Sequence, residues 1–407
     1  MTDSGTAYSM HLFARLVFPA VLLIAAPAFA ASCHKEPTFE AWVQGVAAEA
    51  KAGGASQRAI NDALGGVVFD PAIVKKDRAQ GVFTQDFLQF SDRMVAGYRI
   101  TNGKANIAKL KPVFDRIDKQ FGVPAPVLVA FWGLETDFGA FNGDGPTLTS
   151  LATLGYDCRR PDLFRKQLLS AIKIIDRGDL SAFQMRGPWA GELGQLQFIP
   201  ERYFDFGVDF DGDGRVDLLH SSADALASAA NYLKSLGWHR GEPWLQEVDV
   251  PNTLPWDQAD ISIKLPLSQW SAWGVTLANG KPLPAKGPDA SLHLPMGRNG
   301  PAFLAYPNFD VYLDWNNSLV YSTTAAYYAT RLAGAGPVHR GSGVDLPTVA
   351  EIKEIQKLLA AQGYDIGKAD GIIGAATRAA VKAMQIKYGL PADSYPSEEL
   401  LDKLRGG

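Results

Sequence analysis

Apolar residues recur at intervals of three and four over residues 37–120 of the chain. This spacing places them on one face of successive helices. Two such sets are Phe39, Trp42, Val43 and Val46, and Phe83, Phe87, Phe90 and Met94. Residues 105–121 continue the pattern until Gly122-Val123-Pro124 interrupts it. Since proline is tolerated in the first turn of a helix, we expect a new helix to begin there and to carry the apolar run 127–132.

Two more helices are predicted over residues 163–176 and 222–236, the second with Ser222 as its N-cap. Between them, GPWAGELGQLQFIP (187–200) has the composition of a glycine-rich loop. Residues 245–321 combine many Pro and Gly with alternating apolar runs. We therefore expect a smaller mixed α/β subdomain in this part of the chain.

A helix over residues 324–333 closes this region, and the composition of GAGPVHRGSG (334–343) predicts a linker. We place the linker at 336–347 and a separate C-terminal unit at 348–407. Three amphipathic helices are predicted in the unit. They are marked by Ile352, Ile355, Leu358 and Leu359, by Thr377, Ala380, Val381, Met384 and Tyr388, and by Leu400, Leu401 and Leu404. The predicted fold class is mainly α, in an α+β arrangement.

The chain has 407 residues, of which 47% are hydrophobic and 20% charged, which is enough for more than one globular domain. Its net charge is −4, and no run of Lys and Arg is interleaved with aromatic residues. Because phosphate binding needs a basic face, we exclude nucleic acid as a partner. We expect the protein to act as a monomer.

The N-terminus has the pattern of an export signal. His11 and Arg15 precede LVFPAVLLIAAPAFA, which is short, apolar and ends in Ala28-Phe29-Ala30. These are the charged, apolar and cleavage regions of a signal peptide, which we place at residues 1–30. The apolar run is shorter than the roughly 20 residues of a membrane-spanning helix, so we expect cleavage and a periplasmic location.

Cys33 and Cys158 are the two cysteines of the chain. In an exported protein, two thiols favour one disulfide, which would stabilise the fold by roughly 4–5 kcal/mol on the chain-entropy model. Two alternatives stay open. Cys33 could be a lipidated N-terminus, which the preceding Ala31-Ser32 allows weakly, or Cys158 could be a buried, unpaired thiol.

Glu135 follows the apolar run 127–132 in FWGLETDFG (131–139). An acid at the end of a buried helix loses solvation, so its neutral form is favoured and its pKa rises. A carboxylic acid that is protonated near neutral pH can act as a general acid. Asp137, two residues on, would not share the helical face of Glu135. The alternative is a glutamate that only caps or pairs at a helix end.

Several segments place Glu135 in a wider pattern. In chain order they are ETDFG (135–139), SLATLGYD (150–157), GPWAGELGQLQFIPERYF (187–204), DFDGDGRVD (209–217), DALASAANYLKSLGW (224–238) and HLPMGRNGPAFLAYPNFDVYLDWNNSLVY (293–321). This ordered set resembles the family B lytic murein transglycosylases, the membrane-bound lytic transglycosylase B group. The likeness covers about residues 37–335 and implies a lysozyme-like catalytic domain, which we place at 31–335.

The resemblance implies cleavage of the β-1,4 bond between N-acetylmuramic acid and N-acetylglucosamine in peptidoglycan. It assigns Glu135 as the sole acid and base, with no cofactor needed for the chemistry. The muramoyl C6 hydroxyl would close to a 1,6-anhydro sugar in a non-hydrolytic reaction. An internal hydroxyl has a high effective concentration, so water need not attack.

Other residues carry over from the same resemblance as substrate-binding positions. They are Gln197 of the glycine-rich loop, Tyr232 of the A-N-Y helix, and Asn308, Trp315 and Asn316. Aromatic faces cover the C–H surfaces of sugars, and amides bind their hydroxyls. For Tyr232 and Trp315, ordinary core packing remains the alternative.

The glycine-rich loop departs from the family pattern G-S-W-A-G-A-M-G-Q-T-Q-F-M-P-S at Pro188, Glu192 and Glu201, among other positions. Pro188 replaces Ser, Glu192 replaces Ala, and Glu201 replaces the final Ser. Glu192 is either a solvated loop charge or a modifier of Glu135, since a nearby negative charge would raise the pKa of Glu135 further.

DFDGDGRVDLLH (209–220) resembles an EF-hand loop, with aspartates at the first, third, fifth and ninth positions and Gly214 at the tight turn. His220 stands where the closing glutamate is expected. We predict a structural Ca²⁺ site with the ligand set Asp209, Asp211, Asp213, Arg215, Asp217 and Asp224. The alternative is a turn held by main-chain hydrogen bonds.

The C-terminal unit resembles the type 1 peptidoglycan-binding module. It contains the pattern G-Y…D-G-x-x-G-x-x-T-x-x-A-V, from Gly363-Tyr364 to Ala380-Val381. The resemblance implies that the module anchors the enzyme to peptidoglycan glycan strands. Proteins of cell-wall synthesis or remodelling are further candidate partners.

Two alternative functions stay open. A hydrolytic muramidase would use Glu192 or Asp137 as a second carboxylate to activate water. A non-catalytic peptidoglycan-binding scaffold would bind the wall without turnover.

Overall fold

The structure is a computed structural model that describes residues 36–79, 85–342 and 347–406. The predicted signal peptide (1–30) and Cys33 lie outside the described residues. In the part of the chain that is described, no helix is both long and apolar enough to cross a membrane.

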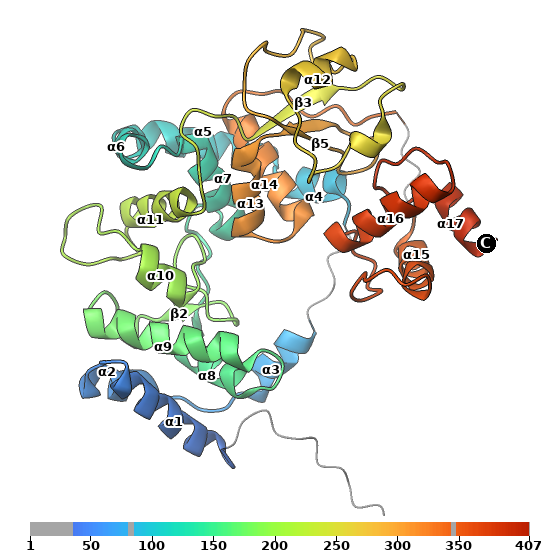
Figure 1. Ribbon diagram of the computed structural model, residues 1–407. Helices are drawn as coiled ribbons and strands as arrows, with labels where there is room; N and C mark the ends of the chain where they lie inside the picture. Colours follow the sequence, from blue (N-terminus) through green and yellow to red (C-terminus); the bar gives the residue numbers. More distant parts are fainter. Residues whose placement is uncertain (1–35, 80–84, 343–346, 407) are drawn as a thin grey trace, which may run out of the picture.

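The predicted helical N-terminal region is confirmed over its described residues (Figure 1), and Phe83 of the predicted pattern lies outside them. Its helices are α1 (Phe39–Ala52), α2 (Gln57–Leu64), α3 (Pro71–Arg78), α4 (Phe87–Met94), α5 (Gly97–Lys109) and α6 (Lys111–Phe121). Side chains cap several of them; for example, the Oδ1 atom of Asp70 accepts a hydrogen bond from the main-chain N of Ala72 at 2.8 Å. Gly122 ends α6 in the left-handed conformation, at φ +79°.

The central helix α7 (Ala125–Thr136) begins after Pro124, as the sequence predicts. It is apolar on all sides because it is packed on all sides: the residues from Val127 to Leu134 are all buried. The helix ends at Asp137, whose φ of 52° is left-handed and cannot continue it.

The helices that follow are α8 (Thr147–Tyr156), α9 (Pro161–Arg177), α10 (Pro200–Phe206) and α11 (Ser222–Ser235). Two short strands, β1 (Gly145–Pro146) and β2 (Arg186–Gly187), pair antiparallel and fix the start of the glycine-rich loop. The predicted N-cap of α11 is wrong by one residue. Ser221 caps the helix, because its hydroxyl accepts the main-chain N–H of Asp224 at 3.2 Å.

The mixed α/β subdomain is confirmed. Its sheet has the order β4-β3-β6-β5 with antiparallel pairs. The elements are β3 (Leu245–Asp249), the 3₁₀ helix η1 (Trp256–Gln258), α12 (Leu267–Ala272), β4 (Thr276–Leu277), β5 (Ser291–His293) and β6 (Phe303–Ala305). Trp270 is completely buried in a separate hydrophobic core beneath this sheet.

Two helices, α13 (Pro307–Trp315) and α14 (Leu319–Leu332), return the chain to the helical core, where α14 packs along α7. The closing helix was predicted to start at residue 324, which is too late. It starts at Leu319 because Ser318 caps it, accepting the main-chain N–H of Tyr321 at 3.4 Å.

The C-terminal module contains α15 (Val349–Ala361), α16 (Ala375–Lys387) and α17 (Glu398–Arg405) around its own core, as predicted. It lies against the mixed subdomain (Figure 1). Arg378, which is buried, donates to the main-chain O of Leu294 at 2.9 Å, and Lys382 binds Asp260 at 2.8 Å.

The described part of the predicted linker is tied to the helical core. The main-chain N of Val338 donates to the hydroxyl of Tyr327 at 3.2 Å, and Arg340 pairs with Asp92 at 3.0 Å. Arg378 and Lys382 join the module to the mixed subdomain, and these two contacts join the linker to the helical core.

Candidate active site

Glu135 lies in the last turn of α7, where the buried helix reaches a partly exposed surface. Two donors from other elements meet at its Oε1 atom. The indole N–H of Trp315 donates at 3.2 Å, and the hydroxyl of Tyr321 donates to the same oxygen. Trp315 ends α13 and Tyr321 lies in the first turn of α14, so the return of the chain to the core builds this contact.

Burial raises the pKa of Glu135 above its ordinary value, and this is the largest effect on the group. The hydrogen bonds from Tyr321 and Trp315 act in the opposite direction, because they stabilise the carboxylate. The negative charge of Glu192 raises the pKa further. Desolvation prevails, so Glu135 holds its proton to higher pH than a solvated glutamate would.

The glycine-rich loop is fastened directly to the end of α7. Thr136, the residue after Glu135, donates its hydroxyl proton to the main-chain O of Gln195 at 2.6 Å. Gly194 has a φ of +79°, and a Cβ atom there would lie 2.4 Å from the main-chain O of Leu218. Glycine is therefore required at position 194, where the loop passes close to the main chain of Leu218.

Gln197 is held in a strained conformation within this loop. Its φ is 51°, in the left-handed region that non-glycine residues seldom adopt. Its side-chain amide donates to the main-chain O of Gly194 at 2.9 Å and to that of Asn142 at 3.4 Å. Such strain often marks a functional position.

A cavity of about 250 Å³ opens beside Trp315. Three of the predicted substrate-binding residues line it: Gln197, Tyr232 and Trp315. The rings of Tyr232 and Trp315 lie 5.6 Å apart, and the guanidinium of Arg202 covers the Tyr232 ring at 4.4 Å. The cavity thus has aromatic walls and polar groups, a combination that suits a sugar ring, and it shares Trp315 with the surroundings of Glu135.

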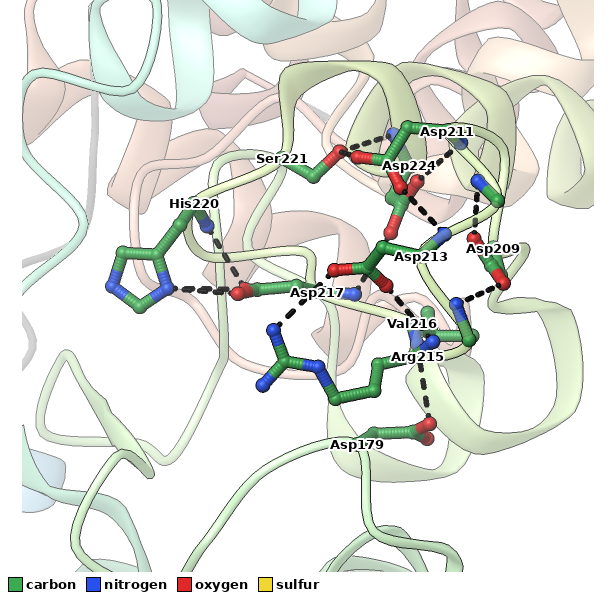
Figure 2. Close-up of polar contacts among 12 residues, drawn as sticks. Asp179, Asp209, Asp211, Asp213, Arg215, Val216, Asp217, His220, Ser221 and Asp224 are labelled. Atoms are coloured by element: carbon green, nitrogen blue, oxygen red, sulfur yellow. Dashed lines mark hydrogen bonds and ion pairs between the residues drawn. The ribbon is translucent and has the colours of Figure 1, made fainter.

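The acidic loop between α10 and α11 gathers three of the predicted calcium ligands (Figure 2). Carboxylate oxygens of Asp209, Asp211 and Asp213 lie within 4.8 Å of one another. Carboxylate oxygens are ligands that Ca²⁺ prefers. Asp209 also accepts the main-chain N–H groups of Gly212 and Gly214, at 2.7 and 2.9 Å, which shapes the turn.

The other predicted ligands are engaged differently (Figure 2). The buried Asp224 accepts three main-chain N–H groups, from Phe210, Asp211 and Asp217, at 2.9–3.2 Å. Asp217 accepts the main-chain N–H groups of Leu219 and His220, and Arg215 binds Asp213 through its guanidinium at 3.3 Å. Asp224 and Asp217 therefore hold the loop in shape from its inner side, and they do not join the group of three.

Comparison with known families decides the class of this architecture. The family model described as the transglycosylase SLT domain matches residues 38–330. The chain belongs to this family. A second family model, described as a peptidoglycan binding domain, matches residues 348–404, which are the three-helix module. The family resemblance and the fold class predicted from the sequence are both confirmed.

Individual relatives agree with this membership. The chain is 28% identical to the membrane-bound lytic murein transglycosylase B of Escherichia coli (strain K12) over 237 residues, which are 58% of this chain and 64% of the relative. The match thus spans less than two thirds of that relative. The crystal structure of SltB3 from Pseudomonas aeruginosa, solved in complex with NAG-anhNAM-pentapeptide, is 41% identical with a TM-score of 0.84. That comparison covers 91% of this chain and all of SltB3.

The Escherichia coli lytic transglycosylase Slt35 in complex with calcium has the same fold. Its TM-score is 0.61 at 24% identity, over 72% of this chain and 92% of Slt35.

Two predicted substrate-binding residues, Asn308 and Asn316, do not line the cavity. Asn308 is completely buried, and its side chain binds the main-chain N and O of His239 and the main-chain O of Glu242, at 2.7–2.9 Å. Asn316 follows α13, and its side-chain oxygen accepts the main-chain N–H of Ser318 at 2.9 Å. Both amides are used to fix the elements that carry Trp315 and Tyr321.

Tyr321 is a site residue that the sequence analysis missed. It stands at the end of the family-like stretch 293–321, but only the contact between α14 and α7 brings its hydroxyl to Glu135. A helix start at Ser318 was the available signal, because it would have placed Tyr321 in a first turn next to Trp315.

Cys158 lies within the described residues and is not a free thiol. Because Cys33 lies outside them, the disulfide between Cys33 and Cys158 stays a prediction.

Proposed function

We propose that the protein is a lytic transglycosylase that cleaves the β-1,4 bond between N-acetylmuramic acid and N-acetylglucosamine in peptidoglycan and leaves 1,6-anhydromuramoyl ends. The observation that carries this proposal is Glu135, a desolvated acid with two hydrogen-bond donors on one oxygen, of which one donor, Trp315, also lines an aromatic cavity. The family match and the ligand of SltB3, which contains an anhydro sugar, support the same reaction.

Glu135 acts first as the general acid. Trp315 and Tyr321 both donate to Oε1, so the proton of the neutral acid resides on Oε2. From there the proton passes to the glycosidic oxygen as the bond between that oxygen and the anomeric carbon C1 of the muramoyl residue breaks. The acetamido group of the substrate stabilises the positive centre, as in substrate-assisted glycosidases, so a second carboxylate is not required.

Glu135 then acts as the base. The carboxylate formed in the first step keeps the hydrogen bonds from Trp315 and Tyr321, which stabilise its charge. It removes the proton of the muramoyl C6 hydroxyl, and the oxygen of that hydroxyl forms a bond with C1 of the same sugar. The nucleophile belongs to the same sugar, so its effective concentration is high and water is not consumed.

A hydrolytic muramidase is the second candidate, and Glu192 is the observation that favours it. One Glu192 oxygen is buried without a hydrogen-bond partner among the described residues, so it is free to bind a water or a substrate group. Asp137 is a weaker candidate for the same role, because its carboxylate pairs with Arg99 at 3.1 Å.

Mass spectrometry of the muropeptides released from purified peptidoglycan tests the proposal. We expect anhydromuramoyl products from the unmodified protein and almost none from Glu135→Gln. Reducing-end products that disappear in Glu192→Gln would establish the muramidase. No release by either protein, with both still sedimenting with the wall, would establish the non-catalytic scaffold.

We also propose that the acidic loop binds a structural Ca²⁺ through Asp209, Asp211 and Asp213. The clustering of their oxygens supports this, and Slt35, which has the same fold, has been solved with calcium. The ion would stabilise the connection between α10 and α11, and α11 carries Tyr232 into the cavity.

We further propose that the protein acts in the periplasm and that the C-terminal module binds peptidoglycan. The export signal of the sequence and the peptidoglycan binding domain match support these statements. Because the module is docked on the mixed subdomain, wall binding would hold the cavity at a fixed position relative to the glycan strand.

A further inference from the structure

The C-terminal module contains two turns that repeat one arrangement. The first turn, Asp370-Gly371-Ile372, lies between α15 and α16, and the second turn, Asp393-Ser394-Tyr395, lies between α16 and α17. Each turn follows a helix that carries a buried glutamine, Gln356 in α15 and Gln385 in α16. The module is therefore built from two copies of a helix and a turn.

The glutamine holds each turn through the same hydrogen bonds. The Oε1 atom of Gln356 accepts the main-chain N–H of Gly371 at 2.8 Å, and its amide donates to the main-chain O of Ile372 at 2.9 Å. Gln385 makes the same two hydrogen bonds with the second turn, at 3.0 and 2.9 Å. The middle residue is left-handed in both turns, with a φ of 86° at Gly371 and 64° at Ser394. The two turns thus have equivalent main-chain geometry.

The aspartate that begins each turn uses one carboxylate oxygen within the turn. The Oδ1 atom of Asp370 accepts the main-chain N–H of Ile372 at 2.9 Å, and the Oδ1 atom of Asp393 accepts that of Tyr395 at 3.1 Å. In both turns this leaves the second oxygen, Oδ2, for a donor from outside the turn.

The second turn binds a main-chain segment of the mixed subdomain, in the loop between β5 and β6. The Oδ2 atom of Asp393 accepts the main-chain N–H of Arg298 at 2.9 Å, and the guanidinium of Arg298 lies 3.6 Å from the same oxygen. The preceding Gly297 has a φ of 75°, and a Cβ atom there would lie 3.0 Å from the Cβ atom of Tyr395. The bound group is therefore an N–H that follows a left-handed residue. Glycine and D residues adopt that conformation readily, whereas L residues seldom do.

The first turn is not bound in this way. Among the residues that the structure describes, no donor reaches the Oδ2 atom of Asp370. A cavity of about 270 Å³ lies beside the turn, lined by Gly371, Ile372 and the buried Arg378, with its other wall from α4 and α14. An arginine there suits a carboxylate. The first turn thus offers a peptide-binding oxygen and a cation beside one cavity.

We propose that the first turn is a subsite for the stem peptide of peptidoglycan, in which the Oδ2 atom of Asp370 accepts a main-chain N–H that follows a D residue. This inference rests on the proposed binding of peptidoglycan by the module, and it names the part of the polymer that the module contacts. The second turn supplies the chemistry, because the N–H bound there follows a left-handed residue. Stem peptides contain D residues, which adopt that conformation without strain. Their carboxylate groups suit the cation of Arg378.

The test is an NMR titration of the full chain labelled with nitrogen-15 isoleucine and tyrosine. Ile372→Val and Tyr395→Phe identify the amide resonances at the two equivalent positions. The ligand is a synthetic stem pentapeptide that ends in D-Ala-D-Ala, and the same peptide made of L residues alone is the control ligand. We expect a saturable shift at Ile372 and none at Tyr395. The control peptide should bind about tenfold more weakly, because its main chain cannot present the N–H without strain.

Asp370→Asn should weaken the response of Ile372 about tenfold, because an amide replaces the charged acceptor. Asp365→Asn is the matched control. Asp365 is an exposed aspartate of the same loop, and its carboxylate accepts the main-chain N–H of Gly367, two residues on, as that of Asp370 does with Ile372. We expect the control to bind the pentapeptide like the unmodified chain.

A shift at Tyr395 in place of Ile372 would overturn the inference, because the peptide would then displace the loop from the second turn. Equal binding of the two peptides, or equal losses in the two aspartate variants, would overturn it as well. If Asp370→Asn does not fold, the comparison of the two peptides in the unmodified chain carries the test. A chain that sediments with the wall without a response at Ile372 would defeat this inference alone. A chain that releases no muropeptides while Ile372 responds would defeat the proposed reaction and leave the subsite standing.

Discussion

Glu135 and the acidic loop at residues 209–217 place carboxyl groups in opposite surroundings. Glu135 is a single acid at the end of an apolar helix, where burial raises its pKa and two donors hold one of its oxygens. Asp211 and Asp213 are exposed and lie together with Asp209 on a polar turn. Desolvation favours the protonated form of Glu135. Three solvated carboxylates close together can instead bind a cation. The same functional group thus takes different roles according to its solvation.

The largest effect is expected from Glu135→Gln, which keeps the shape of the acid and removes its proton. We expect kcat to fall by about 10³-fold, since general acid and base steps contribute on that order. Thermal unfolding should change little, because a neutral amide suits the desolvated site. Muropeptide release measures the activity. Retention of more than about a tenth of the activity would show that another group supplies the proton.

Tyr321→Phe should lower kcat by about tenfold, because the carboxylate formed in the reaction loses one of its two donors. The pKa of Glu135 should rise in this variant, since the lost hydrogen bond stabilised the ionised form, and the basic limb of the pH profile should move to higher pH. Tyr312→Phe is the matched control, because the hydroxyl of Tyr312 has no hydrogen-bond partner among the described residues. Equal losses in the two variants would contradict this role for Tyr321.

Calcium should raise the melting temperature of the full chain by roughly 3–5 °C at saturating concentration, and a chelator should remove this gain. Asp213→Asn should abolish most of the response, whereas Asp205→Asn, an exposed aspartate on the neighbouring α10, should leave it intact. Glu135→Gln should respond like the unmodified protein. Differential scanning calorimetry measures the melting temperature. An equal response to calcium in Asp213→Asn would contradict a calcium site at Asp209, Asp211 and Asp213.

The smallest effect concerns stability and pH. The pKa of Glu135 is raised in the folded state, so between its ordinary value and the raised value the folded chain keeps a proton that the unfolded chain releases. Glu135 therefore lowers the stability of the protein progressively as pH rises through that window. Urea midpoints at a series of pH values should show Glu135→Gln gaining on the unmodified protein over this range. A constant difference between the two would mean that the pKa of Glu135 is not raised.

The sequence was sufficient to predict those parts of the molecule that depend on local pattern. Helical spacing located the N-terminal helices and the three-helix module, and the apolar run 127–132 predicted that Glu135 would be desolvated. The order of the motifs predicted the family. Gln197, Tyr232 and Trp315 line one cavity, as expected for residues of a shared groove.

Contacts between distant elements could not be read from such patterns. Tyr321 reaches Glu135 only because α14 packs along α7, across 186 residues of sequence. Asn308 was predicted to face the groove, yet its amide satisfies main-chain groups of residues 239–242, which its sequence neighbours do not indicate. Asp224 likewise caps three main-chain N–H groups of the acidic loop, a role that depends on the start of α11.

The most direct test of the account is cleavage of peptidoglycan in water enriched in oxygen-18, followed by mass spectrometry of the released muropeptides. Our central claim is that Glu135 alone moves the proton and that the sugar supplies its own nucleophile. It predicts anhydromuramoyl products that contain no oxygen-18. Products that carry one oxygen-18 atom at a reducing muramoyl end would contradict the claim, because water would then be the nucleophile and a second group would have to activate it.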